Sequence, residues 1–153
     1  GRTQFCFHKW ERVTGDPWVL GAVQGYWLEL VSRPVQDSWP RELRFSLDKE
    51  GLIRQELGNL VQKQVISPVD PDVGAGFVSM IFLVPKKESG WRPVINLRAL
   101  NKFIVFRHFK MEGLHLLQDT LQMGDWMVPL DLKDVYFMIP IHLEDRRWLR
   151  FLW

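Results

Sequence analysis

Apolar side chains recur at helical spacing in two stretches of the N-terminal half of the chain. The first stretch opens with Asp16 and Pro17, which are typical of the N-cap and the first turn of a helix. The second opens at Ser46 or Asp48 and repeats apolar residues every three or four positions until the chain approaches Pro68. The pattern therefore predicts a short helix followed by a longer amphipathic one.

Strand-type patterns follow in the C-terminal half. Residues 77–84 form an almost wholly apolar run, and a charged turn separates it from a second run that begins at Trp91. This arrangement predicts a β-hairpin. Residues 27–31 and 128–137 also predict strands, and residues 112–123 predict a third helix.

Composition indicates a globular protein. The chain has 153 residues, of which 46% are hydrophobic, so it can bury a core as one unit. The net charge of +2 is only a mild basic bias, and nucleic-acid binding would have to depend on local clusters. No apolar run approaches the roughly 18 residues that cross a bilayer, and the single Cys6 cannot form an internal disulfide. We therefore expect a soluble intracellular protein without a membrane partner.

The segment 128–137 carries the strongest chemical signal. It places the carboxylates of Asp131 and Asp134 and the ring of Tyr136 at the end of an apolar run. A carboxylate held on a strand can ligate Mg²⁺, which prefers oxygen ligands and bridges to substrate phosphates. An ordinary strand end with a solvated Asp fits this segment as well.

A second segment, residues 82–102, reads as strand, basic turn, strand and polar turn, with Lys86-Lys87 in the turn and Trp91-Arg92 after it. Together the two segments resemble, in order and spacing, the fingers region and the first palm motif of reverse transcriptases. Further stretches resemble retrotransposons of the DIRS group, which carry a tyrosine recombinase: residues 1–18, Gly25-Tyr26, Arg44-Phe45-Ser46 and residues 109–113. The resemblance covers essentially the whole chain. It implies an α+β fold with an N-terminal helix and extended segment in 1–45, a fingers-like region in 46–111 and the start of the palm in 112–153.

The resemblance also implies RNA-directed DNA polymerase chemistry, in which Mg²⁺ assists nucleotidyl transfer from a dNTP to an RNA or DNA primer-template. By this likeness Asp131 is the catalytic metal ligand, and the backbone carbonyl of Leu132 completes its side of the metal site. Asp134 and Val135 fall where the family shapes the sugar pocket. Tyr136 falls where an aromatic ring crowds the 2′ position and excludes ribonucleotides. A strand aromatic packed in the core fits Tyr136 equally well.

The basic residues near the hairpin receive roles from the same resemblance. Arg92 matches the fingers arginine that closes over the triphosphate, and either Lys86 or Lys87 supplies the accompanying ammonium group. A solvated hairpin tip fits these lysines too. A basic and aromatic track for nucleic acid is a further interpretation, although a loop with outward charges and inward phenylalanines has the same pattern. The residues of this track that we expect to contact nucleic acid are Arg98, Lys102 and Lys110.

Three departures from the family pattern limit the catalytic expectation. No paired Asp-Asp motif follows within the 153 residues, so the two-metal site cannot be assembled from this polypeptide alone. Pro129 sits inside a predicted central strand, where it removes a ladder hydrogen bond. Val135 replaces the small residue that is usual beside the aromatic gate. An incomplete palm would also leave apolar side chains exposed, those of Trp148, Leu149, Phe151, Leu152 and Trp153. We therefore expect an N-terminal fragment of a retrotransposon reverse transcriptase, inactive without the missing remainder, with a non-catalytic nucleic-acid or protein interaction remnant as the alternative.

Overall fold

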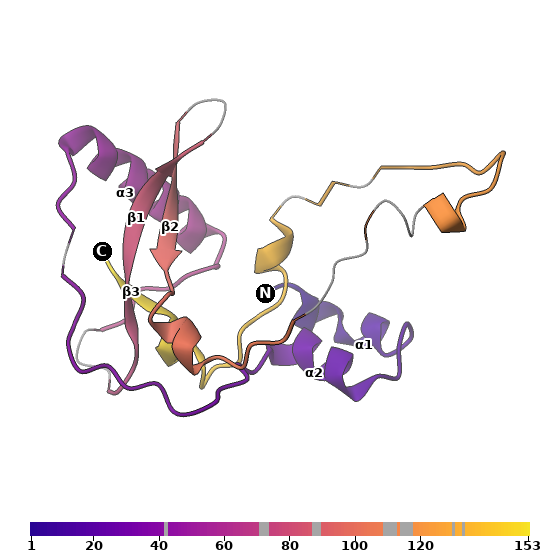
Figure 1. Ribbon diagram of the computed structural model, residues 1–153, viewed down its shortest axis with the longest axis horizontal. Helices are drawn as coiled ribbons and strands as arrows, with labels where there is room; N and C mark the ends of the chain where they lie inside the picture. The colour runs from indigo at the N-terminus through magenta and orange to yellow at the C-terminus, as the bar shows by residue number, and fades with distance from the viewer. Residues whose placement is uncertain are drawn as a thin grey trace.

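The computed structural model describes residues 1–41, 43–70, 74–86, 90–108, 113, 118–129, 131–132 and 134–153. Helices and a small sheet both contribute to it, so the fold is α+β and the predicted fold class is confirmed. Figure 1 shows α3 (Leu47–Gln62) and the sheet on one side and the short N-terminal helices on the other, with an extended arm leading away from both.

The N-terminal helices are η1 (Thr3–Cys6), α1 (Phe7–Trp10) and α2 (Pro17–Gly25). Asp16 caps α2, because its side chain accepts a hydrogen bond of 2.8 Å from the backbone N–H of Trp18. The predicted start of this helix is therefore confirmed. The strand predicted for residues 27–31 is wrong, since this stretch makes a single isolated bridge, Leu30 with Ile104, and no ladder.

Helix α3 (Leu47–Gln62) begins after Ser46, as its apolar spacing predicts. It packs on one face of the antiparallel hairpin formed by β1 (Val78–Pro85) and β2 (Trp91–Asn96), which confirms the predicted hairpin. Ile53 and Leu57 of α3 meet Ile81 of β1 in a core cluster. Successive strand residues point to opposite faces, so Ile81 and its partner Ile95 face α3 while their strand neighbours face away.

The sheet has three strands in the order β2-β1-β3, and β3 (Arg150–Leu152) pairs with β1 in parallel. The 3₁₀ helix η4 (Arg146–Leu149) leads into β3, and η2 (Leu100–Phe103) follows β2. Trp148 is only 7% exposed because it forms a second core cluster with Phe77 and Leu100. The expectation that the apolar residues near the C-terminal end are exposed is thus wrong for Trp148, and Leu149 and Phe151 are half-buried against the two core clusters.

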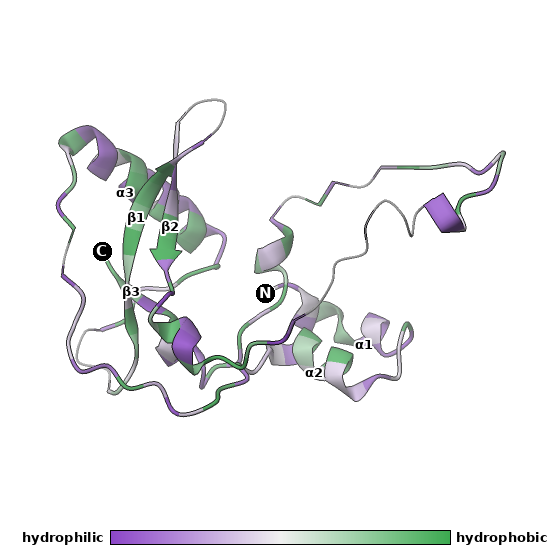
Figure 2. Cartoon of the chain, viewed as in Figure 1, coloured by the Kyte–Doolittle hydropathy of each residue, from purple (hydrophilic) through white to green (hydrophobic). Residues whose placement is uncertain are grey.

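The strand predicted for residues 128–137 is wrong for the residues that the structure describes there, 128–129, 131–132 and 134–137. Its described residues are irregular until η3 (Val135–Phe137), a single turn of 3₁₀ helix. Pro129 has no N–H for a ladder, and none of the three described strands runs beside this segment. In Figure 2 residues 118–129 project from the body with green apolar positions along them, and Trp126 is 99% exposed.

Of the predicted third helix, 112–123, residues 112 and 114–117 lie outside the described residues, and among the described ones residues 118–120 are helical. Among the helices that are described, none has the length and apolar character needed to cross a membrane.

Candidate functional site

Asp131 and Leu132 lie on irregular, exposed backbone between the arm and η3. Within the described part of the chain, no hydrogen bond or ion pair joins the Asp131 carboxylate to Lys86 or Arg92. The structure therefore leaves Asp131 accessible to solvent and does not bring it against the basic residues of the hairpin.

Asp134 is held in a defined position. Its backbone is left-handed, with φ 58° and ψ 25°, a conformation that Asp adopts more readily than most residues. One carboxylate oxygen lies 2.7 Å from the Nζ of Lys63, just beyond the end of α3, and its backbone carbonyl accepts a hydrogen bond of 3.0 Å from Phe137. This ion pair links the start of η3 to the C-terminal end of α3.

A cavity of about 300 Å³ lies at this junction and is shared by three elements. Leu60 of α3, Pro93 of β2 and Phe137 of η3 supply its apolar walls, and the Lys63–Asp134 pair lies at its edge. The sequence prediction missed Lys63, because helical spacing places it near the end of α3 but says nothing about a partner 71 residues away.

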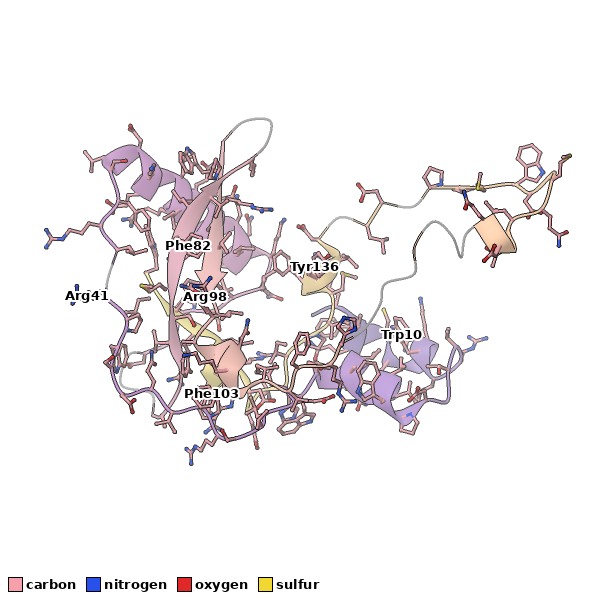
Figure 3. The ribbon with its side chains drawn as sticks, viewed as in Figure 1. Trp10, Arg41, Phe82, Arg98, Phe103 and Tyr136 are labelled. Carbon is pink, nitrogen blue, oxygen red and sulfur yellow. The ribbon has the colours of Figure 1, made fainter. Side chains whose placement is uncertain are left out.

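Tyr136 points into solvent in η3, and Figure 3 labels it on the side of the body nearest the arm. Its side chain is 92% exposed, and the neighbouring Val135 is 39% exposed. The interpretation of Tyr136 as a packed core aromatic is therefore wrong. An exposed ring next to Asp134 has the freedom to contact a ligand, which a buried ring would lack.

The hairpin holds Arg92 on the face of the sheet away from α3. Arg92 is exposed and pairs across the strands with Val84, whereas Trp91 and Pro93 on either side of it face α3. The Lys49 ammonium group lies 4.4 Å from the centre of the Trp91 ring, a cation–π contact that anchors this end of β2 to α3.

Lys86 lies at the end of β1, where its N–H donates a hydrogen bond of 2.9 Å to the carbonyl of Gly90 and closes the turn. Gly90 has φ 83°, which suits a residue without a side chain. Lys86 is exposed, so its ammonium group reaches solvent at the turn end of the hairpin. Lys87 lies outside the described residues.

Only part of the predicted basic and aromatic track lies on the surface of the described residues. Arg98 and Lys102 are exposed, but Phe103 packs against the second core cluster, with its ring 6.1 Å from that of Phe77. Figure 3 shows Arg98 and Phe103 on neighbouring stretches of the body. Phe106, by contrast, is 87% exposed. Lys110 lies outside the described residues, so two of the three predicted basic contacts are available on the surface.

The oxygen donors of the segment 131–134 supply only part of the ligand set that a Mg²⁺ ion needs. Mg²⁺ binds through one or two carboxylates together with water and substrate phosphates. Asp131 offers one such carboxylate, and the carbonyl of Leu132 follows it, whereas Lys63 neutralises Asp134. The described residues contain no group of three or more His, Cys, Asp and Glu side chains arranged to hold a metal. A complete metal centre would need further ligands.

The amino-acid sequence is similar to segments of retroviral polyproteins. It is 29% identical over 115 residues to the Gag-Pro-Pol polyprotein of Squirrel monkey retrovirus, and 30% identical over 115 residues to that of Mason-Pfizer monkey virus. Each match covers 75% of this chain and 6% of the viral polyprotein. The Gag-Pol polyprotein of Baboon endogenous virus (strain M7) is 35% identical over 75 residues, which is 46% of this chain and 4% of the polyprotein.

No protein-family model matches the chain, and no solved structure matches it. The polyprotein matches show that this chain is related to a region of retroelements. The chain spans about 6% of the length of these polyproteins.

Proposed function

We propose that this chain forms the fingers and the first palm segment of a reverse transcriptase from a DIRS-like retrotransposon. The observation that carries the proposal is the β1–β2 hairpin, which has exposed Lys86 and Arg92 near its turn. The hairpin precedes the Asp131–Tyr136 segment in the chain. This is the order of motifs that the family uses. Similarity over 115 residues to retroviral polyproteins supports a retroelement origin.

In this proposal the chain acts as part of a longer polymerase that binds a primer-template and a dNTP. Mg²⁺, when bound, stabilises the charge on the attacking and leaving oxygens of the phosphoryl transfer. Asp131 and the Leu132 carbonyl contribute ligands for that ion. Arg92 contacts the triphosphate through its planar guanidinium group, with Lys86 or Lys87 beside it. Tyr136 contacts the sugar, and the Lys63–Asp134 ion pair holds the turn that carries it.

Single-nucleotide incorporation by the longer protein tests this assignment. Asp131→Asn removes the charge that binds the ion, and we expect incorporation to fall on the order of 100-fold or more, the size of effect seen when one organised electrostatic contact is lost. Asp119→Asn is a matched control, because Asp119 is an exposed carboxylate on the same arm. Equal rates for Asp131→Asn and the unaltered protein would refute the proposal.

A non-catalytic interaction module is the second candidate. It is favoured by the absence, among the described residues, of any group of three acidic, His or Cys side chains that could hold a metal. In that case nucleic-acid binding survives Asp131→Asn and no Mg²⁺-dependent extension appears, even in the longer protein. The two candidates therefore differ for the unaltered longer protein, which extends a primer with Mg²⁺ only if the first candidate is correct.

A further inference from the structure

The N-terminal unit, residues 1–28, binds along the chain that follows η3. The backbone N–H of Thr3 donates a hydrogen bond of 3.1 Å to the carbonyl of Met138. The backbone N–H of Tyr26, just after α2, donates one of 2.8 Å to the carbonyl of Pro140. In Figure 1 the segment after η3 accordingly passes beside the N-terminal helices. Two parts of the N-terminal unit thus hold the same short segment through its backbone.

His142 is the closest point of this docking. Its backbone N–H donates a hydrogen bond of 3.0 Å to the carbonyl of Tyr26, and its imidazole stacks on the ring of Trp27, with ring centres 3.4 Å apart at an angle of 19°. Gly25, the last residue of α2, is buried, and a Cβ atom built on it would lie 3.4 Å from the Cα of His142. A larger side chain at position 25 would therefore push the two segments apart.

The docked segment begins directly after η3, so η3 is held at both ends. The Lys63–Asp134 ion pair holds its start, and Met138, bound by the N-terminal unit, follows its last residue. Tyr136 lies midway, two residues after Asp134 and two before Met138. A single turn of 3₁₀ helix has little stability of its own. The position of Tyr136 therefore depends on the two anchors.

We propose that the N-terminal unit is a positioning element for Tyr136, and that Gly25 and Trp27 are the positioning residues through which it acts. This inference rests on the proposed function, in which Tyr136 contacts the sugar of the incoming nucleotide. It gives a role to residues 1–18 and Gly25-Tyr26, which the polymerase assignment leaves without one. Asp131 precedes both anchors of η3, so loss of the docking should disturb sugar selection more than the binding of the metal ion.

Amide hydrogen exchange of the 153-residue chain tests the docking directly. Gly25→Leu places a side chain against His142, whereas Gly21→Leu makes the same change in α2 at a position where a Cβ meets nothing within 4 Å. We expect exchange at the amides of Phe137 and Met138 to accelerate about tenfold or more in Gly25→Leu, because η3 opens more often, and to stay unchanged in Gly21→Leu. Equal exchange at these amides in the two variants would overturn the proposal.

Trp27→Ala decides the matter if Gly25→Leu also accelerates exchange in β1 and so unfolds the whole chain. It removes the stacking on His142 without adding bulk, and Trp27 is 52% exposed, so the fold should tolerate the change. We expect faster exchange at the amides of Phe137 and Met138 and unchanged protection in β1. Unchanged protection in η3 as well would overturn the proposal.

Nucleotide incorporation by the longer protein tests the consequence for sugar selection. Gly25→Leu should lower the preference for a dNTP over the matching ribonucleotide about tenfold, mainly through a higher KM for the dNTP. Gly25→Ala should keep most of that preference, because its Cβ lies at an ordinary contact distance from His142. Unchanged sugar preference and KM in Gly25→Leu would overturn the positioning role and leave the polymerase assignment intact.

The two measurements also separate this inference from the proposed function. No incorporation by the unaltered longer protein would overturn the polymerase assignment, and the role in sugar selection with it. The exchange measurement on the 153-residue chain does not depend on polymerase activity, so it supports or overturns the anchoring of η3 by the N-terminal unit in either case.

Discussion

Replacing Ile53 with Ala tests the packing of α3 on the hairpin. The Ile53 side chain is 0% exposed and packs with Leu57 and Ile81 in one core cluster. The substitution removes three carbon groups, worth about 0.8 kcal/mol each in transfer from water, and the cavity left behind adds to that cost. We therefore expect the free energy of unfolding to fall by about 2.5–4 kcal/mol.

Leu52→Ala is the matched control, because it removes the same number of carbons from the adjacent position of the same helix. Leu52 is 39% exposed, so its side chain is only partly removed from water on folding and its truncation leaves no closed cavity. We therefore expect the free energy of unfolding to fall by less than about 1.5 kcal/mol. Urea unfolding followed by far-UV circular dichroism gives both values, and the midpoint should shift without a change in the m-value. Equal losses for the two variants would refute the packing of α3 through Ile53.

Three other substitutions probe single contacts. Gln36→Ala should lower the free energy of unfolding by about 1–3 kcal/mol in urea, because the Gln36 amide both donates to and accepts from the buried backbone of Val78 at 2.8 Å. Asp145→Ala removes the acceptor of the Leu28 N–H, 2.7 Å away, so hydrogen exchange at that amide should accelerate; unchanged protection would contradict this contact. Tyr136→Ala should change stability by no more than about 0.5 kcal/mol because the ring is exposed, while in the longer protein it should relax discrimination against ribonucleotides in incorporation assays.

Local sequence signals were sufficient to predict α2, α3 and the β1–β2 hairpin. Asp16 marks the start of α2 because a carboxylate one residue before Pro17 can cap the free N–H groups, and this depends only on nearby residues. The spacing of Ile53 and Leu57 determines which face of α3 is buried. A charged turn between two apolar runs leaves the strands adjacent in the chain, so antiparallel pairing costs little loop entropy.

The candidate site was predictable only as a set of residue types. The sequence identified Asp131, Asp134 and Tyr136 as chemically notable, and the structure leaves Asp131 and Tyr136 exposed on one short segment. The sequence contained no signal for the partner of Asp134, because Lys63 contacts that carboxylate only through the arrangement of α3 and η3 in space. Contacts between distant side chains depend on tertiary packing, which periodicity does not report.

By itself, then, the sequence determined the elements whose hydrogen bonds are local, together with the resemblance that suggests a polymerase. Tertiary structure alone decided that the described residues of the segment 128–137 form no strand, since a strand needs a neighbour and Pro129 cannot donate to one. It also decided that Trp148 is buried and that β3 pairs with β1. Both outcomes join residues about 70 positions apart, and the free energy of such contacts comes from surfaces that meet only after the chain has folded.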